Sequence, residues 1–459
     1  MLKRFVGRMG MRELQGRDPA ELRTVFLMLF MFVFLNADVM LMVPSFRAIR
    51  DEFGKNEAAI GLVASLFVFS GAGIALVSGY LADRYPRKLL VFFTILLGEI
   101  PCLLTGYVRS FEELFLIRAL TGLGIGGLMP LIYSMIGDLV TDKERATASS
   151  WIGLAEGVGL ALGMAIAGNL VERTDVAFLG ASGWRLPFVL AALPNFILAP
   201  LFLLLAKEPP RGGGEKAIQK ELAQGLEYKR RIKLRDYRTI FRNRTNLYFI
   251  LQAVPGTIGW GVLPNWVVAY YQEKNVSAAL ATNLNLLIGL GMILGGFFGG
   301  ILGDKLHRRN KKYSPILCGI TTLLGLAFFL AMLHWPLPDH PAVAEMAGPL
   351  AIGIIGGFLI TVTSSNIRAI VLNVNPPENR GAMMSIFTLS DSIGKGLGPV
   401  LGGVLIVAVG YIWTMDLATL AWIPCALVFL FLLTPQYPKD AAHLDQLMAE
   451  RAKEMEQSL

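Results

Sequence analysis

Charged side chains inside long apolar runs are the feature of this sequence that points most directly to chemistry. Each ionised group costs at least a few kcal/mol at the centre of a lipid bilayer, so such residues are rare and usually functional. They bind protons, pair with one another or hold charged ligands. Seven residues qualify: Asp38, Glu99, Arg118, Glu156, Arg368, Asp391 and Lys395.

Asp38, Arg118 and Glu156 form a candidate proton-coupling group. No cation lies within a helical turn of Asp38 in the sequence, which favours a functional acid. At about 1.5 Å per residue, Asp38 and Arg118 each lie roughly 9–12 Å from the same predicted membrane face, and Glu156 lies about 16 Å into its run. We predict that Asp38 takes up a proton and that Arg118 feels its charge, with Glu156 as the alternative proton carrier. A structural ion pair is the competing interpretation of Arg118.

A second group is predicted to contact a ligand. It combines Arg368, Asp391 and Lys395 with polar and aromatic residues of other runs, namely Asn36, Tyr133, Trp260 and Asn265. Each has an alternative explanation. Asp391 and Lys395 are four residues apart and can satisfy each other on one helix face. Arg368 can extend its head group to the membrane surface, and Asn side chains often bond between helices. Glu99, two residues before Pro101, has no counterpart in the other half of the chain and can serve to cap a kink.

The elements that carry these residues are long and apolar. Of the 459 residues, 54% are hydrophobic and 17% are charged, whereas soluble domains carry roughly a quarter charged residues. A soluble enzyme is therefore excluded. About twelve runs reach the length of about 20 residues that a helix needs to cross a membrane. They lie near 24–46, 58–81, 88–107, 112–138, 145–169, 185–206, 245–271, 279–303, 313–334, 347–374, 381–408 and 413–433.

Backbone groups in lipid must bond within their own segment, so these runs are expected to be helices. We predict an all-α membrane protein with twelve transmembrane helices in two pseudo-symmetric six-helix bundles. Its expected organisation is a cytoplasmic N-terminal segment and a first bundle, a cytoplasmic central loop with an amphipathic helix, then a second bundle and a cytoplasmic tail. The corresponding ranges are 1–23, 24–206, 207–244, 245–433 and 434–459.

The net charge of +8 is distributed in a way that argues against nucleic acid as a partner. Basic residues concentrate before the first run, between the second and third runs, in the central loop and after the eighth run. The intervening loops are mixed or acidic, which is the positive-inside pattern. We expect a monomer in the bacterial inner (plasma) membrane, surrounded by lipid, with both termini in the cytoplasm.

The two halves repeat each other. Residues 79–88 and 300–309 share a helix-end glycine, an acid and a basic run, and Asp138 and Arg145 have the spacing of Asn373 and Arg380. Stripes of small residues follow an acid in each half, at Glu156-Gly159-Gly163-Ala167 and Asp391-Gly394-Gly398-Gly402. Such stripes let membrane helices approach closely. The loop residues predict a gate at the cytoplasmic helix ends, formed by Asp83, Arg84, Arg87, Asp138, Arg145, Asp304 and Arg380.

Several sequence motifs of soluble enzymes are incomplete here or lack the structural context that they require. The segment 122–127 satisfies a dinucleotide-binding pattern but has no preceding strand, and 392–396 lacks the glycine spacing of a P-loop. The four histidines are scattered without metal-ligand spacing. We expect no cofactor, no metal and no enzymatic activity. The three cysteines, Cys102, Cys318 and Cys425, lie inside apolar runs and are interpreted as small buried hydrophobic residues.

With its loop repeat, its glycine-rich fifth run and Arg118 placed four residues before Gly122, the chain resembles the major facilitator superfamily. The resemblance extends over nearly the whole chain. The first half resembles the spinster-like lipid transporters. The matching residues are Asp138-Leu139, Arg145, Gly159, Gly163, Trp184-Arg185 and 208–212. This resemblance implies a proton-coupled carrier of sphingoid lipids or lysophospholipids, with a first-helix acid and a fourth-helix Arg-Glu set in its coupling machinery.

Two departures from that group bear on coupling. Ile125 stands where the group has its fourth-helix acid, and Asp38 lies about a turn nearer the proline than the usual first-helix acid. We therefore expect proton coupling in this chain to depend on a different set of residues, namely Asp38, Arg118 and Glu156. The predicted activity is secondary active transport by alternating access, driven by protons, with an amphipathic lipid as cargo. A carrier of a small organic anion or drug-like molecule is the first alternative, and a non-transporting receptor or scaffold is the second.

Overall fold

The computed structural model describes residues 19–82, 84–139, 145–173, 183–208, 240–375 and 377–457. Twelve helices in this part of the chain are long and apolar enough to cross a membrane, and its residues form no strand. The predicted all-α, twelve-span architecture is confirmed. The chain divides into two compact units, Met1–Arg230 and Arg231–Leu459.

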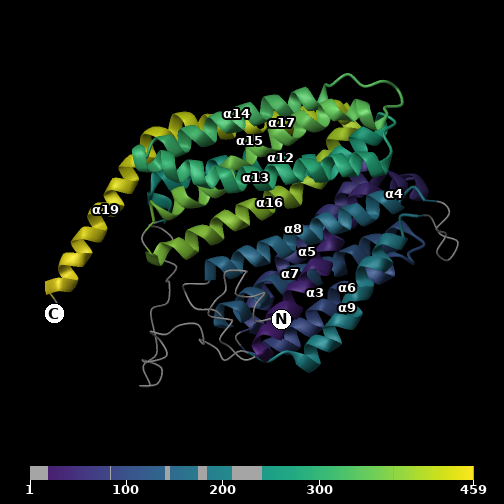
Figure 1. Ribbon diagram of the computed structural model, residues 1–459, viewed down its shortest axis with the longest axis horizontal. Helices are drawn as coiled ribbons and strands as arrows, with labels where there is room; N and C mark the ends of the chain where they lie inside the picture. Colours follow the sequence, from purple (N-terminus) through teal and green to yellow (C-terminus); the bar gives the residue numbers. More distant parts are fainter. Residues whose placement is uncertain are drawn as a thin grey trace. The chain divides into compact units, whose positions relative to one another are not determined.

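Unit 1 is a bundle of long helices (Figure 1). Its described elements are α3 (Pro19–Leu41), the short 3-10 helix η1 (Val43–Ser45), α4 (Phe46–Phe53), α5 (Glu57–Ala82), α6 (Arg87–Thr105), α7 (Phe111–Leu139), α8 (Arg145–Leu170) and α9 (Leu186–Leu205). The first span thus breaks at Pro44 and continues as α4.

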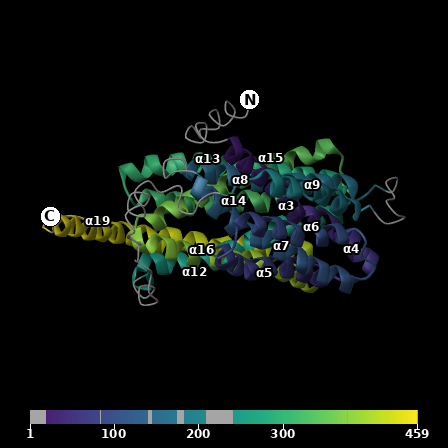
Figure 2. The same ribbon diagram turned by 90° about the horizontal axis from the view of Figure 1, so that it is seen from below.

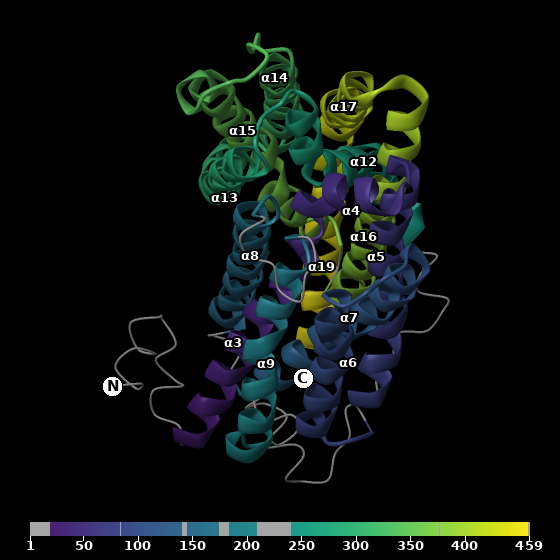
Figure 3. The same cartoon turned by 90° about the vertical axis from the view of Figure 1, so that its right-hand side faces the viewer.

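Unit 2 contains α12 (Arg244–Glu273), α13 (Ala278–Arg309), α14 (Tyr313–Leu333), η3 (Val343–Met346), α15 (Ala347–Leu372) and α16 (Pro377–Val409). Its last span is assembled from α17 (Tyr411–Leu420), α18 (Trp422–Leu427) and the π-helical turn η4 (Val428–Leu433), and α19 (Thr434–Gln457) follows. Within this unit α13, α14 and α15 lie side by side (Figures 1 and 3). The run of α19 beyond its bundle is also visible in Figure 2.

The helices of the two units pair in the same pattern. In unit 1 the main contacts join α3 to α8 and α9, α5 to α7, and α6 to α7 and α9. In unit 2 the corresponding contacts join α12 to α16 and to α17 and α18, α13 to α15, and α14 to α15 and α18. The sequence repeat therefore corresponds to a repeated helix arrangement.

Glycine positions the helices within each unit. A Cβ atom at Gly163 of α8 would collide with the backbone of Ala37 in α3, and one at Gly398 of α16 would collide with the backbone of Gly261 in α12. Backbones this close exclude any side chain at the crossing, as the stripes of small residues predicted. The α3–α8 and α12–α16 pairs hold the acids of the candidate sites.

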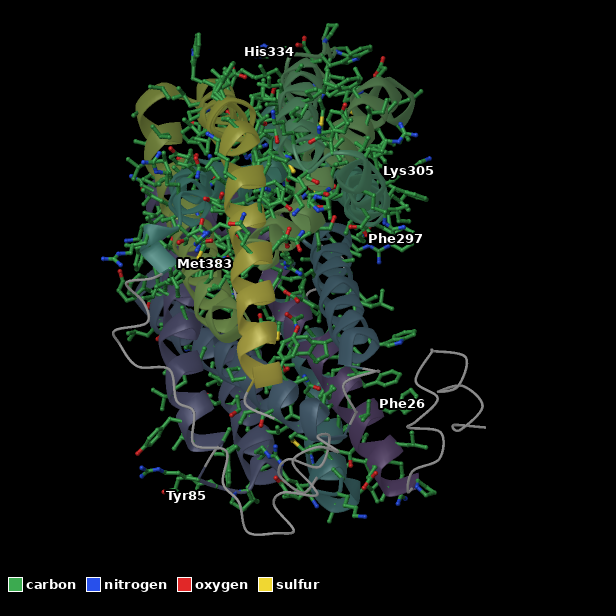
Figure 4. All side chains as sticks on the ribbon, turned by 90° about the vertical axis from the view of Figure 1, so that its left-hand side faces the viewer. Phe26, Tyr85, Phe297, Lys305, His334 and Met383 are labelled. Atoms are coloured by element: carbon green, nitrogen blue, oxygen red, sulfur yellow. The ribbon has the colours of Figure 1, made fainter. Side chains whose placement is uncertain are left out.

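The cores of the units are apolar, and so are their outer faces. One buried cluster in unit 1 centres on Phe32, Ile132 and Phe202, and one in unit 2 centres on Phe249, Phe429 and Tyr437. Large apolar side chains also cover the outside. Phe297 is 65% exposed and projects from α13 (Figure 4). In water this surface would be unfavourable, whereas lipid solvates it.

The structure describes only parts of the N-terminal segment, the central loop and the C-terminal tail. Residues 1–18 and nearly all of the central loop, including its predicted amphipathic helix, lie outside the described residues. The first described helix, α3, begins at Pro19, before the apolar run itself. The C-terminal tail is helical as far as Gln457, and the first turns of α19 bury Tyr437, Ala441 and Leu444.

Candidate functional sites

Asp38 and Arg118 form a buried ion pair in the core of unit 1. Arg118 Nη1 donates to Asp38 Oδ1 at 2.7 Å, and Nη2 lies 3.4 Å from the Asp38 carbonyl oxygen. Both side chains are 1% exposed. Asp38 comes from α3, near its end, and Arg118 from the second turn of α7, so the pair ties two separate spans together.

Two aromatic rings enclose the guanidinium. The Arg118 Cζ lies 4.5 Å from the ring centroid of Phe67 and 5.3 Å from that of Phe188. Aromatic faces stabilise a cation without offering it a hydrogen-bond acceptor. Two polar atoms of the pair, Asp38 Oδ2 and Arg118 Nε, have no hydrogen-bond partner among the described residues. The ion pair therefore has unused bonding capacity on both sides.

Glu99 of α6 lies in the same core and is fully buried. Its Oε1 accepts a hydrogen bond from Asn195 Nδ2 of α9, and the same amide donates to the Met31 carbonyl of α3 at 3.1 Å. The sequence left Glu99 as a residue that caps a kink. In the structure it instead joins three helices through a neutral amide.

Glu156 lies half-buried on α8, one turn before Gly159. The side chains of Asp38 and Arg118 pair with each other. The structure thus brings together two of the three residues predicted for proton coupling, and places Glu99 nearby as a residue that the sequence did not assign to them. Glu99 was visible in the sequence as an intramembrane acid, but its contact with α9 depends on tertiary packing.

Unit 2 contains a pocket of about 250 Å³. Four of the predicted ligand-binding residues line it: Trp260, Arg368, Asp391 and Lys395. Lys395 Nζ lies 2.7 Å from Asp391 Oδ2, so the two also satisfy each other along α16. The two residues therefore pair along the helix and also line the pocket.

The pocket lining combines polar and apolar side chains. Residues of α15 and α16 supply hydroxyls and charges, among them Thr363, Ser364 and Arg368. Aromatic and aliphatic side chains, among them Trp422, Phe387 and Phe429, form the rest. Trp422 is fixed by its indole N–H, which donates to the Gly256 carbonyl at 3.0 Å. Trp422 and Thr363 are not among the residues predicted from the sequence, although 361–366 is unusually rich in hydroxyl and amide groups for an apolar run.

The other three predicted ligand contacts lie elsewhere. Asn265 Nδ2 donates to the Gly261 carbonyl at 2.9 Å, and Asn36 Nδ2 donates to the Phe32 carbonyl at 2.8 Å. Each amide thus bonds to its own helix, four residues back. Tyr133 is 46% exposed on α7 of unit 1. None of the three lines the unit 2 pocket.

The predicted gate residues are described only in part. Asp83 lies outside the described residues, as do the side chains of Asp138, Arg145 and Arg380. Asp304 is exposed on α13, five residues before the helix ends. The guanidinium of Arg84 lies 4.3 Å from the ring centroid of Tyr80.

Arg87 is held within unit 1 by Glu208. Its Nε lies 3.1 Å from Glu208 Oε1, and its Nη1 donates to the Ser134 hydroxyl at 3.0 Å. The Glu208 carboxylate also accepts the backbone N–H groups of Arg87 and Lys88, the first residues of α6. A carboxylate at a helix N-terminus satisfies free donors and complements the helix dipole. Arg87 is therefore part of a structural anchor as well as a gate candidate.

Two bundles of six spans, with a buried ion pair in one and an amphipathic pocket in the other, have the architecture of a membrane transporter. Residues 26–344 and 346–453 match the sequence model of the Major Facilitator Superfamily, and the chain belongs to that family. It is an integral membrane protein and not an enzyme.

The similarity to spinster proteins predicted from the sequence is confirmed. The chain is 24% identical over 401 residues to protein spinster homolog 1 of Xenopus tropicalis, covering 83% of this chain and 72% of that protein. It is also 24% identical over 383 residues to multidrug resistance protein 1 of Bacillus subtilis, covering 83% and 89%. A solved bacterial homolog of the human lysosomal transporter Spinster, in an inward-facing and unoccupied conformation, superposes with a TM-score of 0.78. It is 20% identical, over 93% of this chain and 99% of that one, and the likeness is one of fold.

Proposed function

We propose that this protein is a proton-coupled secondary transporter of an amphipathic lipid, such as a lysophospholipid or a sphingoid lipid, and works by alternating access. The observation that carries the cargo assignment is the combination of charged and apolar side chains in the lining of the unit 2 pocket. A single-chain lipid has a charged head group and an apolar chain, and the pocket offers Arg368 and Lys395 beside Trp260, Trp422 and Phe429. The similarity to spinster homolog 1 supports the same class of cargo.

Proton coupling is assigned to Asp38 and Arg118, with Glu156 as a further member. Protonation of Asp38 would remove the charge that holds Arg118 and break the direct link between α3 and α7. Because a buried guanidinium requires a compensating charge, Arg118 must then be balanced by another group, and the two protonation states favour different arrangements of α3 and α7. The acid therefore converts a proton gradient into a conformational bias.

A drug-like or small anionic molecule is the alternative cargo. The similarity to multidrug resistance protein 1 supports it, and so do the two cations of the pocket. Asp391 argues against a simple anion, because its carboxylate lies 2.7 Å from one of those cations and offsets its charge. A zwitterionic or mixed-charge head group fits this lining better.

We place the protein as a monomer in a bacterial inner membrane with both termini in the cytoplasm, as the positive-inside distribution of Lys and Arg favours. The residues at the helix ends near 83–87, 138–145, 304 and 380 would form the cytoplasmic gate. Movement of the two bundles would then alternate access to the substrate site.

Flux into proteoliposomes tests the proposal. Purified protein is reconstituted and uptake of a labelled lysophospholipid, a sphingoid base and a small organic anion is measured with and without an inward proton gradient. We expect gradient-driven lipid uptake, its loss in Asp38→Asn, and gradient-free exchange that persists in that variant. Arg368→Ala should raise the lipid KM. Proton-driven accumulation by Asp38→Asn would reject the coupling assignment, and failure of lysolipids to compete with a transported anion would reject the cargo.

A further inference from the structure

Charge balance in the core of unit 1 identifies Glu99 as an exception. Three arginines are buried in the described part of this unit, and each lies against a carboxylate. Arg118 pairs with Asp38, Arg87 with Glu208, and Arg185 with Glu52 at 2.6 Å. Glu99 is fully buried and has no cationic partner among the described residues. An isolated buried carboxylate is far more costly than a paired one.

The bonds of Glu99 are those of an acid that faces a neutral group. Its Oε1 accepts from the Asn195 amide, and its Oε2 has no partner among the described residues. Asn195 Oδ1 is also without a partner there. One amide hydrogen bond is too little to hold a full negative charge in an apolar core, where a carboxylate normally receives several donors or a cation.

The surroundings of Glu99 connect it to the ion pair. The helix α6 packs against α3, α7 and α9 and touches α5. Asp38 of α3 interacts electrostatically with Glu99, and Asp38, Glu99 and Arg118 of α7 all interact with Cys102, three residues further along α6. The helix α9 carries no titratable residue, and Glu57 and Tyr80 lie at the two ends of α5. The site thus holds two carboxyls and one guanidinium.

We propose that Glu99 is a second proton-binding site, which holds a proton while Asp38 is paired with Arg118 and releases it when Asp38 is protonated. In the first state Asp38 and Arg118 cancel, and Glu99 is neutral. In the second state a proton forms an O–H bond at Asp38 Oδ2 as the O–H bond at Glu99 breaks. Glu99 then carries the negative charge that balances Arg118. The net charge of the three groups is zero in both states, so the core never contains an uncompensated charge.

Proton binding is tested by infrared spectroscopy of the purified full-length protein in detergent at neutral pH. A protonated buried carboxyl gives a carbonyl stretching band separate from those of carboxylates and amides. We expect this band in the wild type and its loss in Glu99→Gln. The matched control is Glu113→Gln, because Glu113 is exposed and accepts the Arg109 backbone N–H. That variant should keep the band.

Coupling between the two acids is tested by Asp38→Asn. Without the Asp38 charge, Arg118 should draw the negative charge to Glu99, and the band assigned to Glu99 should disappear although Glu99 is still present. If a variant fails to fold, wild-type protein with isotopically labelled glutamate side chains gives the same information, because only a glutamic acid band then shifts. A band that persists in Glu99→Gln, or that does not shift on glutamate labelling, would overturn the proposal.

The consequence for transport rests on the proposed proton coupling. Glu99→Gln cannot release its proton, so pH-driven accumulation should fall to the level of gradient-free exchange. Wild-type transport that ignores the proton gradient would reject the proposed function and leave the infrared result standing. Loss of the infrared assignment with intact proton-driven uptake in Glu99→Gln would reject the second site alone.

Discussion

At the scale of single residues, each buried arginine in the described part of unit 1 lies against a carboxylate that compensates its charge. Asp38 and Arg118 compensate each other across α3 and α7, and the flanking rings of Phe67 and Phe188 keep the guanidinium out of contact with further acceptors. Such a pair contributes little net stability compared with an apolar core of the same shape. It does make each partner strongly dependent on the other, which is the property a proton-driven switch requires.

This dependence predicts a non-additive stability effect. Arg118→Met should lower the free energy of unfolding by about 3–5 kcal/mol, because it leaves the Asp38 carboxylate buried and alone. The double variant Asp38→Leu with Arg118→Met should be more stable than that single variant. Equilibrium unfolding in detergent, monitored by circular dichroism, measures both. Additive losses from the two substitutions would show that the residues do not act as a pair.

At the scale of elements, close helix crossings set where the charged residues lie. The α3–α8 crossing places Gly159 and Gly163 against the backbone of Val33 and Ala37, next to Asp38 in the sequence. At the α12–α16 crossing Gly398 lies against the backbone of Gly261, and Gly394 lies against the Thr257 side chain; both glycines follow Asp391. Each acid is therefore on a helix whose position is determined by backbone contact and is insensitive to side-chain repacking.

Replacing one glycine of α8 should be costly where another is harmless. A Cβ at Gly163 would meet the backbone of Ala37, whereas a Cβ at Gly157 of the same helix would meet nothing within 4 Å. We expect Gly163→Ala to lower the thermal unfolding midpoint of the detergent-solubilised protein by several degrees, since backbone cannot yield as a side chain can. Gly157→Ala should leave the midpoint unchanged or raise it slightly, because alanine favours helix by about 1 kcal/mol. Equal effects of the two substitutions would contradict the crossing.

At the scale of the whole molecule, the chain consists of two units with separate cores and the same order of helix pairing. The buried pair lies wholly in one unit and the amphipathic pocket wholly in the other. If both act in one transport cycle, proton binding and cargo binding are coupled by a change that involves both units. Such coupling is a free energy shared between two sites.

Separate cores predict that the covalent link between the units is dispensable for assembly. Co-expression of residues 1–230 and 231–459 as two chains should give a membrane-inserted complex that purifies through a tag on either part. Proton-driven uptake by this complex should reach at least a substantial fraction of the intact chain's rate. The control is each part expressed alone, which should insert but show no uptake. Failure of the two parts to co-purify would contradict assembly without the covalent link.

The sequence by itself determined the number of spans, the repeat and the family. Run length and apolarity predict membrane helices because lipid forces the backbone to bond within its own segment, and small residues at helical spacing predict close crossings. These are local properties, so they can be recognised in one run at a time. Composition likewise identified Asp38, Glu99, Arg118, Asp391 and Lys395 as unusual, since charge in an apolar run is costly wherever the run packs.

Only the tertiary structure decided which of these residues meet. Asn36 and Asn265 are predicted from the sequence to contact a ligand, and the structure adds that each amide bonds to a carbonyl of its own helix. Glu99 looked like a local cap, but α9 brings Asn195 against it from almost a hundred residues away. Trp422 had no signal in its run and lines the pocket because α18 packs on α12 and α14. Partners depend on the rotation of each helix about its axis, which is set by the packing of all its neighbours and not by its own sequence.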